Sequence, residues 1–410
     1  MNFDIKKLSA EKIFIPLIIV SLAFENFRLF SVIGASFKPI HAIAAAAIIY
    51  FFFFKKITFK KVAGSLIFLV IPLLPFYRIN DTREFMKTYV IYAMMVLFIT
   101  LVLPHLKEEF KEGFSGYYRL FNNVIIILCV LGVIQFIAMN IFNYELFGDI
   151  FGRFEYHTNN ATVKSGISRA YSIFHEPSYF GWVLDIALAI NLVIKDEGEE
   201  KRKPFILVLL VASTIMTVSA SAIWIMAIIL VVYLISIRKI SVNVVLIAPI
   251  VVFAVIALLY LFDFSFITDS LNRLFSEINV ENTSTFERIK SPIEYVKATM
   301  THYPFFGRGL GQEGFIDEIG IIGTYQGVNN SVFGAFVTLG LTAIVYYVWL
   351  VMQFFGKYGK KNIITRAILL FVLFGMYFST GAFLAFDTFI FLVIVLMFLA
   401  IMEKERGNTK

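Results

Sequence analysis

The feature that most restricts the fold of this chain is a run of 34 residues, 204–237, without a single Asp, Glu, Lys or Arg. A helix that crosses a lipid bilayer needs about 20 mostly apolar residues. Other charge-free runs recur along the whole sequence, at 39–54, 62–77, 88–106, 120–144, 240–262, 319–356 and 367–386. The pattern therefore predicts a chain that crosses a membrane many times.

Composition supports this reading and excludes the soluble classes. Hydrophobic residues make up 59% of the chain and charged residues 16%, whereas globular domains average about 45–50% and 25%. A water-soluble fold would have no surface on which to place this apolar excess. The single cysteine, Cys129, excludes an intramolecular disulfide.

We predict an all-α, polytopic membrane protein of about twelve transmembrane helices, forming one domain over residues 1–410. The run 204–237 is too long for one crossing, and we divide it near Ser219 into two helices. The predicted spans are 13–24, 39–54, 62–77, 87–104, 120–142, 177–194, 204–218, 221–237, 240–262, 331–354, 367–383 and 387–402.

The distribution of Lys and Arg predicts the orientation of these spans, because cytoplasmic loops are enriched in both residues. With both termini in the cytoplasm, the inner segments hold 23 of the 36 Lys and Arg. The net charge of +7 largely reflects this bias, so we expect no nucleic-acid partner.

Two extracytoplasmic segments, 143–176 and 263–330, are much longer than a connection requires. Long loops in compact proteins are usually functional or disordered, and these two carry aromatic residues and glycines. In the second, Ser284–Glu287 and Ser291–Glu294 both have the pattern of a capping box, the latter with Pro292 at the first helical position. We therefore expect the second long loop to be partly helical.

The densest polar group of the sequence lies at the start of the span 177–194. It includes Arg169, His175, Glu176 and Pro177. Pro177 suits the first position of a helix, which makes Glu176 the N-cap, at the end of the helix dipole that favours an anion. Glu176 is then either a functional carboxylate or only a cap. Asp185, further along the same span, is a proton relay or part of a polar cavity, or it makes an interhelical hydrogen bond.

A second group lies in the long loop 263–330. Arg288 is followed by Tyr303-Pro304-Phe305-Phe306-Gly307-Arg308-Gly309-Leu310-Gly311, and Asn329-Asn330 then opens the next span. The glycines match a dinucleotide-binding pattern, but that site would require a preceding strand and a crossover helix. Between membrane helices, we expect them to form a tight turn or to allow close approach to a substrate. The five histidines show no metal-ligand spacing, and we expect neither a metal nor a cofactor.

Together, these two groups resemble the Wzy-type O-antigen and capsular polysaccharide polymerases, within the O-antigen ligase-like group of membrane proteins. The likeness rests on Arg169 with Phe174–Gly181, on Arg288 with Tyr303–Gly311, and on Asn329-Asn330 with the later Gly340-Leu341. With the twelve spans, it covers nearly the whole chain. Ligases of the group typically have a His-Asn pair where this chain has Asn329-Asn330.

The resemblance implies a glycosyltransferase at the outer face of the plasma (inner) membrane. It would move a growing glycan from undecaprenyl diphosphate to the non-reducing end of a lipid-linked repeat unit, with a flippase and a chain-length regulator as partners and membrane lipid around it. Arginines would stabilise the diphosphate, because a guanidinium binds phosphate through a planar, permanently charged fork. The expected binding residues are Arg169, Arg288, Arg308, Tyr303, Asn329 and Asn330.

The acceptor hydroxyl requires a base, and we expect Glu176 to act in this role, with His175 as the alternative. Two other functions stay open. A ligase would move the polymer to an acceptor other than the lipid carrier. A transporter or flippase for lipid-linked sugars should show internal repeats, and the sequence has none.

Overall fold

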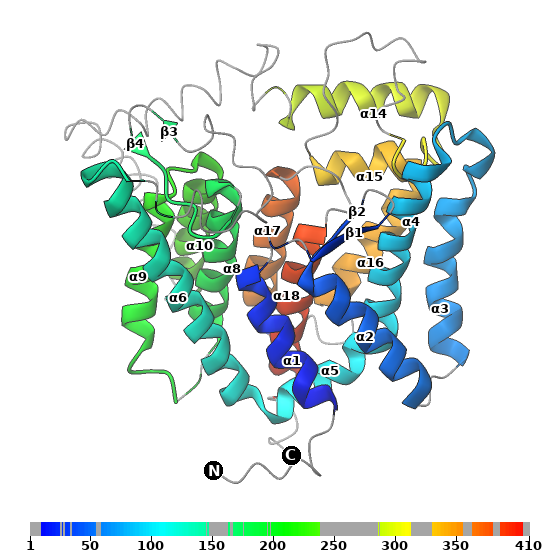
Figure 1. The fold of residues 1–410 in the computed structure, drawn as a ribbon. Helices are drawn as coiled ribbons and strands as arrows, with labels where there is room; N and C mark the ends of the chain where they lie inside the picture. Colours follow the sequence, from blue (N-terminus) through cyan, green and yellow to red (C-terminus); the bar gives the residue numbers. More distant parts are fainter. Residues whose placement is uncertain are drawn as a thin grey trace. The chain divides into compact units, whose positions relative to one another are not determined.

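The computed structural model describes most of the predicted helices. The described residues are 10–24, 27, 29–32, 35–54, 59–144, 146, 163–164, 167–174, 176–194, 196, 198–237, 286, 288–312, 330–355, 363–379 and 386–404. They form a helical protein with two short antiparallel strand pairs, β1 (Phe30–Val32) with β2 (Ala35–Phe37) and β3 (Val163–Lys164) with β4 (Ile167–Ser168) (Figure 1). The predicted all-α class is confirmed.

The chain divides into two compact units. Unit 1 comprises Met1–Phe121, Glu281–Lys361 and Met376–Lys410, and unit 2 comprises Asn122–Val280 and Asn362–Gly375. The divisions fall within helices α6 (Phe114–Ile141) and α17 (Ile363–Ser379).

Unit 1 contains most of the described helices. They are α1 (Ala10–Ser21), α2 (Pro39–Phe54), α3 (Phe59–Val70), α4 (Thr82–Leu97), α5 (Leu103–Glu112), α14 (Lys290–His302), α15 (Ser331–Leu339), α16 (Ala343–Phe355) and α18 (Phe386–Lys404). Short helical turns η2 (Leu22–Phe24), η3 (Ile71–Leu73), η4 (Phe76–Arg78), η5 (Phe98–Val102) and η8 (Gly340–Thr342) extend or join them. Helices α4 and α5 are continuous through η5, which is a π-helical turn.

Aromatic side chains form much of the core of unit 1. The ring of Phe398 in α18 contacts Phe110 of α5 and Phe121 of α6, each with ring centroids 5.1 Å apart. Phe98 of η5 contacts Phe389 in the same way. The many phenylalanines of the sequence are therefore used both inside the bundle and on its outer surface, where Phe53 is 74% exposed.

Unit 2 is a bundle of α6, α8 (Pro177–Val193), α9 (Lys203–Met216), α10 (Ala220–Ile237) and most of α17. Small residues let its helices approach closely. A Cβ atom on Gly181 would lie 2.4 Å from Cβ of Ala222 in α10, and one on Gly132 of α6 would lie 2.6 Å from the ring of Phe180. A buried hydrogen bond from Asn191 to Asn122 also joins α8 to α6.

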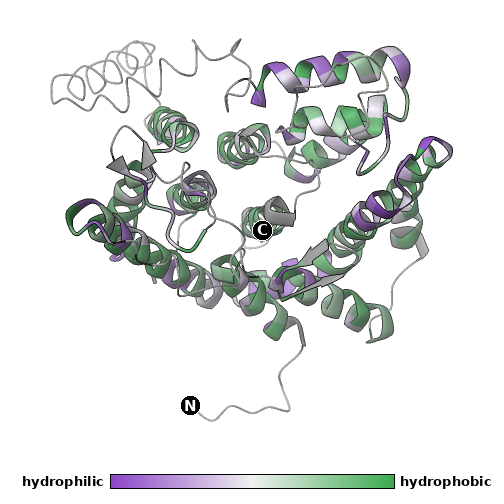
Figure 2. Ribbon diagram, turned by 45° about the horizontal axis from the view of Figure 1, so that its top comes forward, coloured by the Kyte–Doolittle hydropathy of each residue, from purple (hydrophilic) through white to green (hydrophobic). Residues whose placement is uncertain are grey.

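Each predicted span except 240–262, which lies outside the described residues, contains a helix. By length and composition, three helices in the described part of the chain could cross a membrane: Thr82–Glu112, Phe114–Ile141 and Ser331–Phe355. Figure 2 shows how strongly hydrophobic residues dominate the helices of both units. The chain is therefore a membrane protein, and the count of twelve spans remains a prediction.

Within residues 263–330, the second predicted long loop, the structure describes the helix α14. The expected capping box at Ser291–Glu294 is wrong. The helix begins at Lys290 after Ile289, so Ser291 and Pro292 already lie in its first turn, where both are buried. Tyr295 of α14 packs with Val337 of α15, and this contact, rather than a capping hydroxyl, holds the helix. Helices α14 and α15 run across the direction of α3 and α4 (Figure 1).

Candidate active site

The segment that leads into α8 in unit 2 is held by two amide side chains of α6. Asn140 donates to the carbonyl of Ser168 and accepts from its N–H, at 2.8 and 2.9 Å. Gln135 accepts from the N–H groups of Tyr171 and Ser172, at 2.9 and 2.8 Å, and donates to the Ser172 carbonyl. These bonds fix the backbone just before Glu176, including the left-handed Ser172 (φ 53°).

Arg169 lies on this anchored segment. Its Nε donates to the carbonyl of Thr217, 3.0 Å away, and the neighbouring Ala170 N–H donates to the carbonyl of Met216. The arginine is thereby attached to the turn that follows α9. One edge of the guanidinium is used in this contact, and the side chain is only partly buried.

Glu176 is the N-cap of α8, as predicted, with Pro177 at the first helical position. Its backbone is extended (φ −140°, ψ 148°), but its carboxylate accepts no hydrogen bond from the helix N–H groups. Instead, Oε2 accepts from the Ser178 hydroxyl at 2.9 Å. A residue that only capped the helix would bond to the N–H of the second or third helical residue. The carboxylate thus lies at the positive end of the helix dipole without capping it.

Asp185 lies two turns further along α8 and is completely buried. Neither carboxylate oxygen has a hydrogen-bond partner within the ranges that the structure describes. The interhelical hydrogen bond considered from the sequence is not found there. The predicted base alternative, His175, lies outside the described residues.

In unit 1, the glycines after α14 form the tight turn that the sequence predicted. Gly307, Gly309 and Gly311 have φ values of 65°, 104° and 69°, in the region that favours glycine. Gly307 packs against Gly340, whose backbone N would lie 2.5 Å from a Cβ on Gly307. Backbone bonds from Arg308 N–H to Val337 and from Gly309 N–H to Thr338 then join the turn to the end of α15.

This turn places Arg308 against Tyr303. Arg308 is 3% exposed, its Nη1 donates to the Tyr303 hydroxyl at 3.1 Å, and its guanidinium carbon lies 5.3 Å from the centre of that ring. A second guanidinium, that of Arg78 in η4, lies 4.9 Å from the same ring centre. Two permanently charged groups therefore share one aromatic ring.

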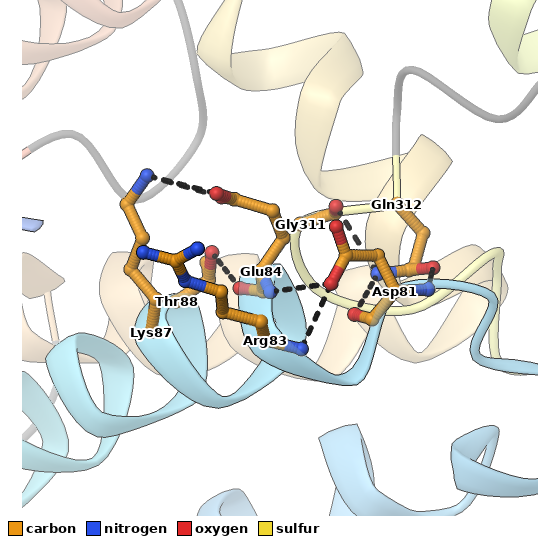
Figure 3. A network of polar contacts seen from close by, with 7 residues as sticks. All are labelled: Asp81, Arg83, Glu84, Lys87, Thr88, Gly311 and Gln312. Carbon is orange, nitrogen blue, oxygen red and sulfur yellow. Dashed lines mark hydrogen bonds and ion pairs between the residues drawn. The ribbon is translucent and has the colours of Figure 1, made fainter. Parts of the chain in front are cut away.

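Gln312 fastens the end of the turn to the start of α4 (Figure 3). Its Oε1 accepts from the N–H groups of Asn80 and Asp81, and its Nε2 donates to the Asp81 carbonyl. Asp81 in turn caps α4, accepting from the N–H groups of Arg83 and Glu84. Gly311 lies against the backbone of Glu84. A Cβ placed on Gly311 would lie 2.7 Å from the carbonyl oxygen of Glu84.

Arg288 and Asn330 are linked through the backbone. Asn330 is the buried N-cap of α15, and its side chain accepts from the N–H groups of Val332 and Phe333. Its Nδ2 donates to the carbonyl of Arg288 at 2.9 Å. Both the oxygen and the nitrogen of this amide form hydrogen bonds within the protein, so the geometry favours a role for Asn330 in positioning Arg288. Asn329 lies outside the described residues.

The structure therefore assembles two clusters from the predicted residues. Arg308 and Tyr303 lie together in unit 1, where Asn330 also holds Arg288, and Arg169 and Glu176 lie on one anchored segment of unit 2. No group of three or more His, Cys, Asp or Glu suited to a metal ion occurs among the residues described.

Sequence reasoning missed four residues that build these clusters: Arg78, Gln312, Gln135 and Asn140. Gln135 and Asn140 had a visible signal, because they are polar side chains within the apolar run 120–144. Arg78 had a weaker signal in the sequence, because it is a cation at the outer end of a predicted span. Gln312 bonds to residues more than 230 positions away, and no local pattern indicates that.

Comparison with known proteins decides the family. A sequence profile of the WcaD colanic acid polymerase family matches residues 12–402. The chain belongs to the WcaD family. No curated protein matches it. The resemblance to Wzy-type polymerases is confirmed, since WcaD is a family of that type. The match includes both clusters, so the described geometry is that of a polysaccharide polymerase of the membrane.

Proposed function

We propose that this WcaD-family protein extends a polysaccharide at the outer face of the plasma membrane. The growing glycan leaves undecaprenyl diphosphate and joins the non-reducing end of a lipid-linked repeat unit. Family membership supports the polymerase class. The observation that carries the donor chemistry is the buried guanidinium of Arg308, held on Tyr303 by a turn that is bonded on several sides.

The reaction requires a stabilised leaving group. The acceptor hydroxyl loses its proton, its oxygen bonds to the anomeric carbon, and the bond from that carbon to the phosphate oxygen breaks. The electron pair goes to the diphosphate, which leaves on its lipid. Arginine stabilises such a group well, since its planar fork offers two parallel hydrogen bonds to phosphate. We assign this role to Arg308, Arg288 and Arg169, with Tyr303 orienting Arg308.

The reaction also requires a proton acceptor, and we assign Glu176. Its carboxylate makes one described hydrogen bond, from Ser178, and does not cap the helix. It lies at the positive end of the α8 dipole, and a carboxylate is one of the groups that act as general bases. His175 is the next residue to test if Glu176 is not the base. Asn329 stays a proposed binding residue through its place beside Asn330.

Deletion of the gene tests the reaction class. Loss of a polymerase leaves surface products that carry single repeat units, visible as one short band on a gel. Loss of a ligase would leave free lipid-linked polymer, and loss of a flippase would leave neither product outside. Purified protein in detergent, given lipid-linked repeat units, should then make polymer by itself.

The orientation has its own test. We propose that both termini are cytoplasmic and that 143–176 and 263–330 are outside, because most Lys and Arg lie in the opposite segments. A reporter that works only in the cytoplasm should be active when fused after Lys410. Activity of an outward-only reporter at that position would overturn the orientation and the external site with it.

Arg288→Lys tests the geometry of phosphate binding. Lysine keeps the charge but offers a point charge instead of a fork. We expect much of the activity to be lost while the variant still accumulates in the membrane. Polymer of wild-type length from this variant would reduce Arg288 to a structural residue.

A further inference from the structure

Arg78 was not among the residues that the sequence singled out, and its surroundings are unusual. It ends η4, and its guanidinium carbon lies 4.7 Å from the ring centre of Tyr77 and 4.9 Å from that of Tyr303. Within the described ranges, its guanidinium makes these two ring contacts and no ion pair with a carboxylate. An arginine over an aromatic face keeps its outer N–H groups available to a ligand.

The carboxylates nearest in sequence are already used. The Asp81 side chain caps α4, and Glu84 forms an ion pair with Lys87 at 3.0 Å (Figure 3). Arg78 and Arg308 therefore share the Tyr303 ring while the acidic groups of this segment bond elsewhere. Among the described residues, Arg78 therefore carries its positive charge beside this ring without a carboxylate partner, which favours a bound anion.

The segments that carry the two arginines form one body. Pro75 and Ile79 lie 3.7 and 3.9 Å from a Cβ placed on Gly309, so η4 and its flanks pack against the glycine turn. Gln312 ties the same turn to Asn80 and Asp81. The spacing of the two guanidiniums is therefore set by the fold, as a preorganised anion site requires.

Exposed apolar side chains flank the pair on both segments. Tyr77 beside Arg78 is 74% exposed, and Phe305, between Tyr303 and Arg308, is 66% exposed; Phe76 and Phe306 are exposed as well. Aromatic residues gather where a membrane protein meets the headgroup level. An anion site bordered by apolar rings suits a ligand with a diphosphate head and a hydrocarbon chain.

We propose that Arg78, Tyr303 and Arg308 form a binding site for a prenyl diphosphate. The two guanidiniums hold the diphosphate, and Tyr77 and Phe305 contact the first isoprene units. The inference rests on the proposed function, which supplies a lipid diphosphate as donor, and it adds Arg78 and the apolar border to that site. A headgroup of bulk anionic phospholipid offers related chemistry, so the test separates the two.

The test measures binding by titration calorimetry on the purified full chain in detergent. The probes are farnesyl diphosphate and inorganic pyrophosphate. We expect farnesyl diphosphate to bind at least about tenfold more tightly than pyrophosphate, because only the former reaches the apolar border. Arg78→Gln should weaken both probes by about tenfold, in line with the loss of one charge-assisted contact. Tyr77→Ala and Phe305→Ala should weaken farnesyl diphosphate alone.

Two matched controls accompany these variants. Arg83→Gln removes the same charge from an exposed position five residues from Arg78, and Phe53→Ala removes an exposed ring from α2. Both should stay within about twofold of the wild type. If Arg78→Gln and Arg83→Gln behave alike, the effect is long-range charge and the site is overturned. Equal loss of both probes in Phe305→Ala and Tyr77→Ala would overturn the apolar border.

A second arm uses nanodiscs with and without phosphatidylglycerol. If this lipid competes for the site as strongly as farnesyl diphosphate does, and Arg78→Gln abolishes the competition, the site takes anionic headgroups in general and the prenyl diphosphate assignment fails. Should Arg78→Gln not fold, as judged by size-exclusion and thermal unfolding, Arg78→Lys and Tyr303→Phe carry the same test with smaller expected losses.

Failure of this inference differs from failure of the proposed function. A wild-type chain that makes polymer, with Arg78→Gln showing an unchanged KM for the lipid-linked repeat, overturns the site and leaves the polymerase. A wild-type chain that binds farnesyl diphosphate through Arg78 but makes no polymer leaves the site and overturns the reaction.

Discussion

The two clusters are built by opposite means. In unit 1, glycines with positive φ bring backbone against backbone, and the arginine they carry is almost completely buried. In unit 2, two amide side chains of α6 hold a segment without glycine, in which Ser172 itself has a positive φ, and the carboxylate at its end is partly exposed. The first arrangement suits tight, rigid binding of a charged group. The second leaves a carboxylate with spare hydrogen-bonding capacity, which suits proton transfer.

The comparison predicts its largest effect at Glu176. Glu176→Gln keeps the size of the side chain but removes the proposed base, so the rate of polymer formation per folded protein should fall about a hundredfold or more. KM for the lipid-linked repeat should change little, since the arginines remain. The assay is polymer formed by purified protein in detergent.

Ser178→Ala serves as the control for Glu176. It removes the hydroxyl that donates to the carboxylate but keeps the carboxylate itself. Its activity should stay within severalfold of the wild type. A near-normal rate of polymer formation in Glu176→Gln would contradict the assignment of proton transfer to the unit 2 cluster and binding to the unit 1 cluster.

Gly307→Ala should give the next largest effect. The left-handed backbone costs a residue with a Cβ about 1–2 kcal/mol, and here the new Cβ also meets the backbone of Gly340 and Thr338. About 2 kcal/mol corresponds to roughly a thirtyfold shift between ordered and disordered turn. Thermal unfolding in detergent and polymer yield should both report it.

Gly116→Ala is the matched change without such a contact. A Cβ at Gly116 of α6 has no neighbour within 4 Å. Alanine favours a helix over glycine by up to about 1 kcal/mol, so this variant should be as stable as the wild type or more so. If Gly307→Ala and Gly116→Ala have the same unfolding temperature and polymer yield, the claim that the glycine turn is rigid is contradicted.

Arg308→Lys should have a smaller effect, and of a different kind from Glu176→Gln. Lysine cannot reproduce both the bond to Tyr303 and a forked contact with phosphate. We expect KM for the lipid-linked repeat to rise about tenfold while kcat changes by less than about threefold. A loss confined to kcat would move Arg308 from binding to the chemical step.

Gln312→Ala should give the smallest effect of the four. It removes three hydrogen bonds between the glycine turn and the start of α4 and leaves the N–H groups of Asn80 and Asp81 without that acceptor. The arginines stay on their own segments, so KM should rise only about threefold. An unchanged KM together with an unchanged unfolding temperature would show that this clamp is dispensable.

The sequence predicted the helices better than it predicted the clusters. Local features of the sequence predict these elements: the apolar runs predict the helices, and Pro177 predicts the N-cap at Glu176. The glycine turn was also predictable, because glycine adopts a positive φ more readily than any other residue. The hydrogen bonds of Gln312, and the contact of Arg78 and Arg308 with one ring, join segments more than 220 residues apart. A local sequence pattern cannot predict contacts between such distant segments. The capping box at Ser291 failed because packing on α15 outweighed a weak local pattern.

The meeting of Gly307 and Gly340 has a consequence for how this chain can change over generations. Most packed pairs can drift, since a larger residue on one side is accepted once the other side becomes smaller. Here both partners are already the smallest residue, and each would place its Cβ within 2.5 Å of the other's backbone nitrogen. No exchange at one position can compensate for a change at the other. A screen for suppressors of Gly307→Ala should therefore return true revertants or changes elsewhere, and none at position 340.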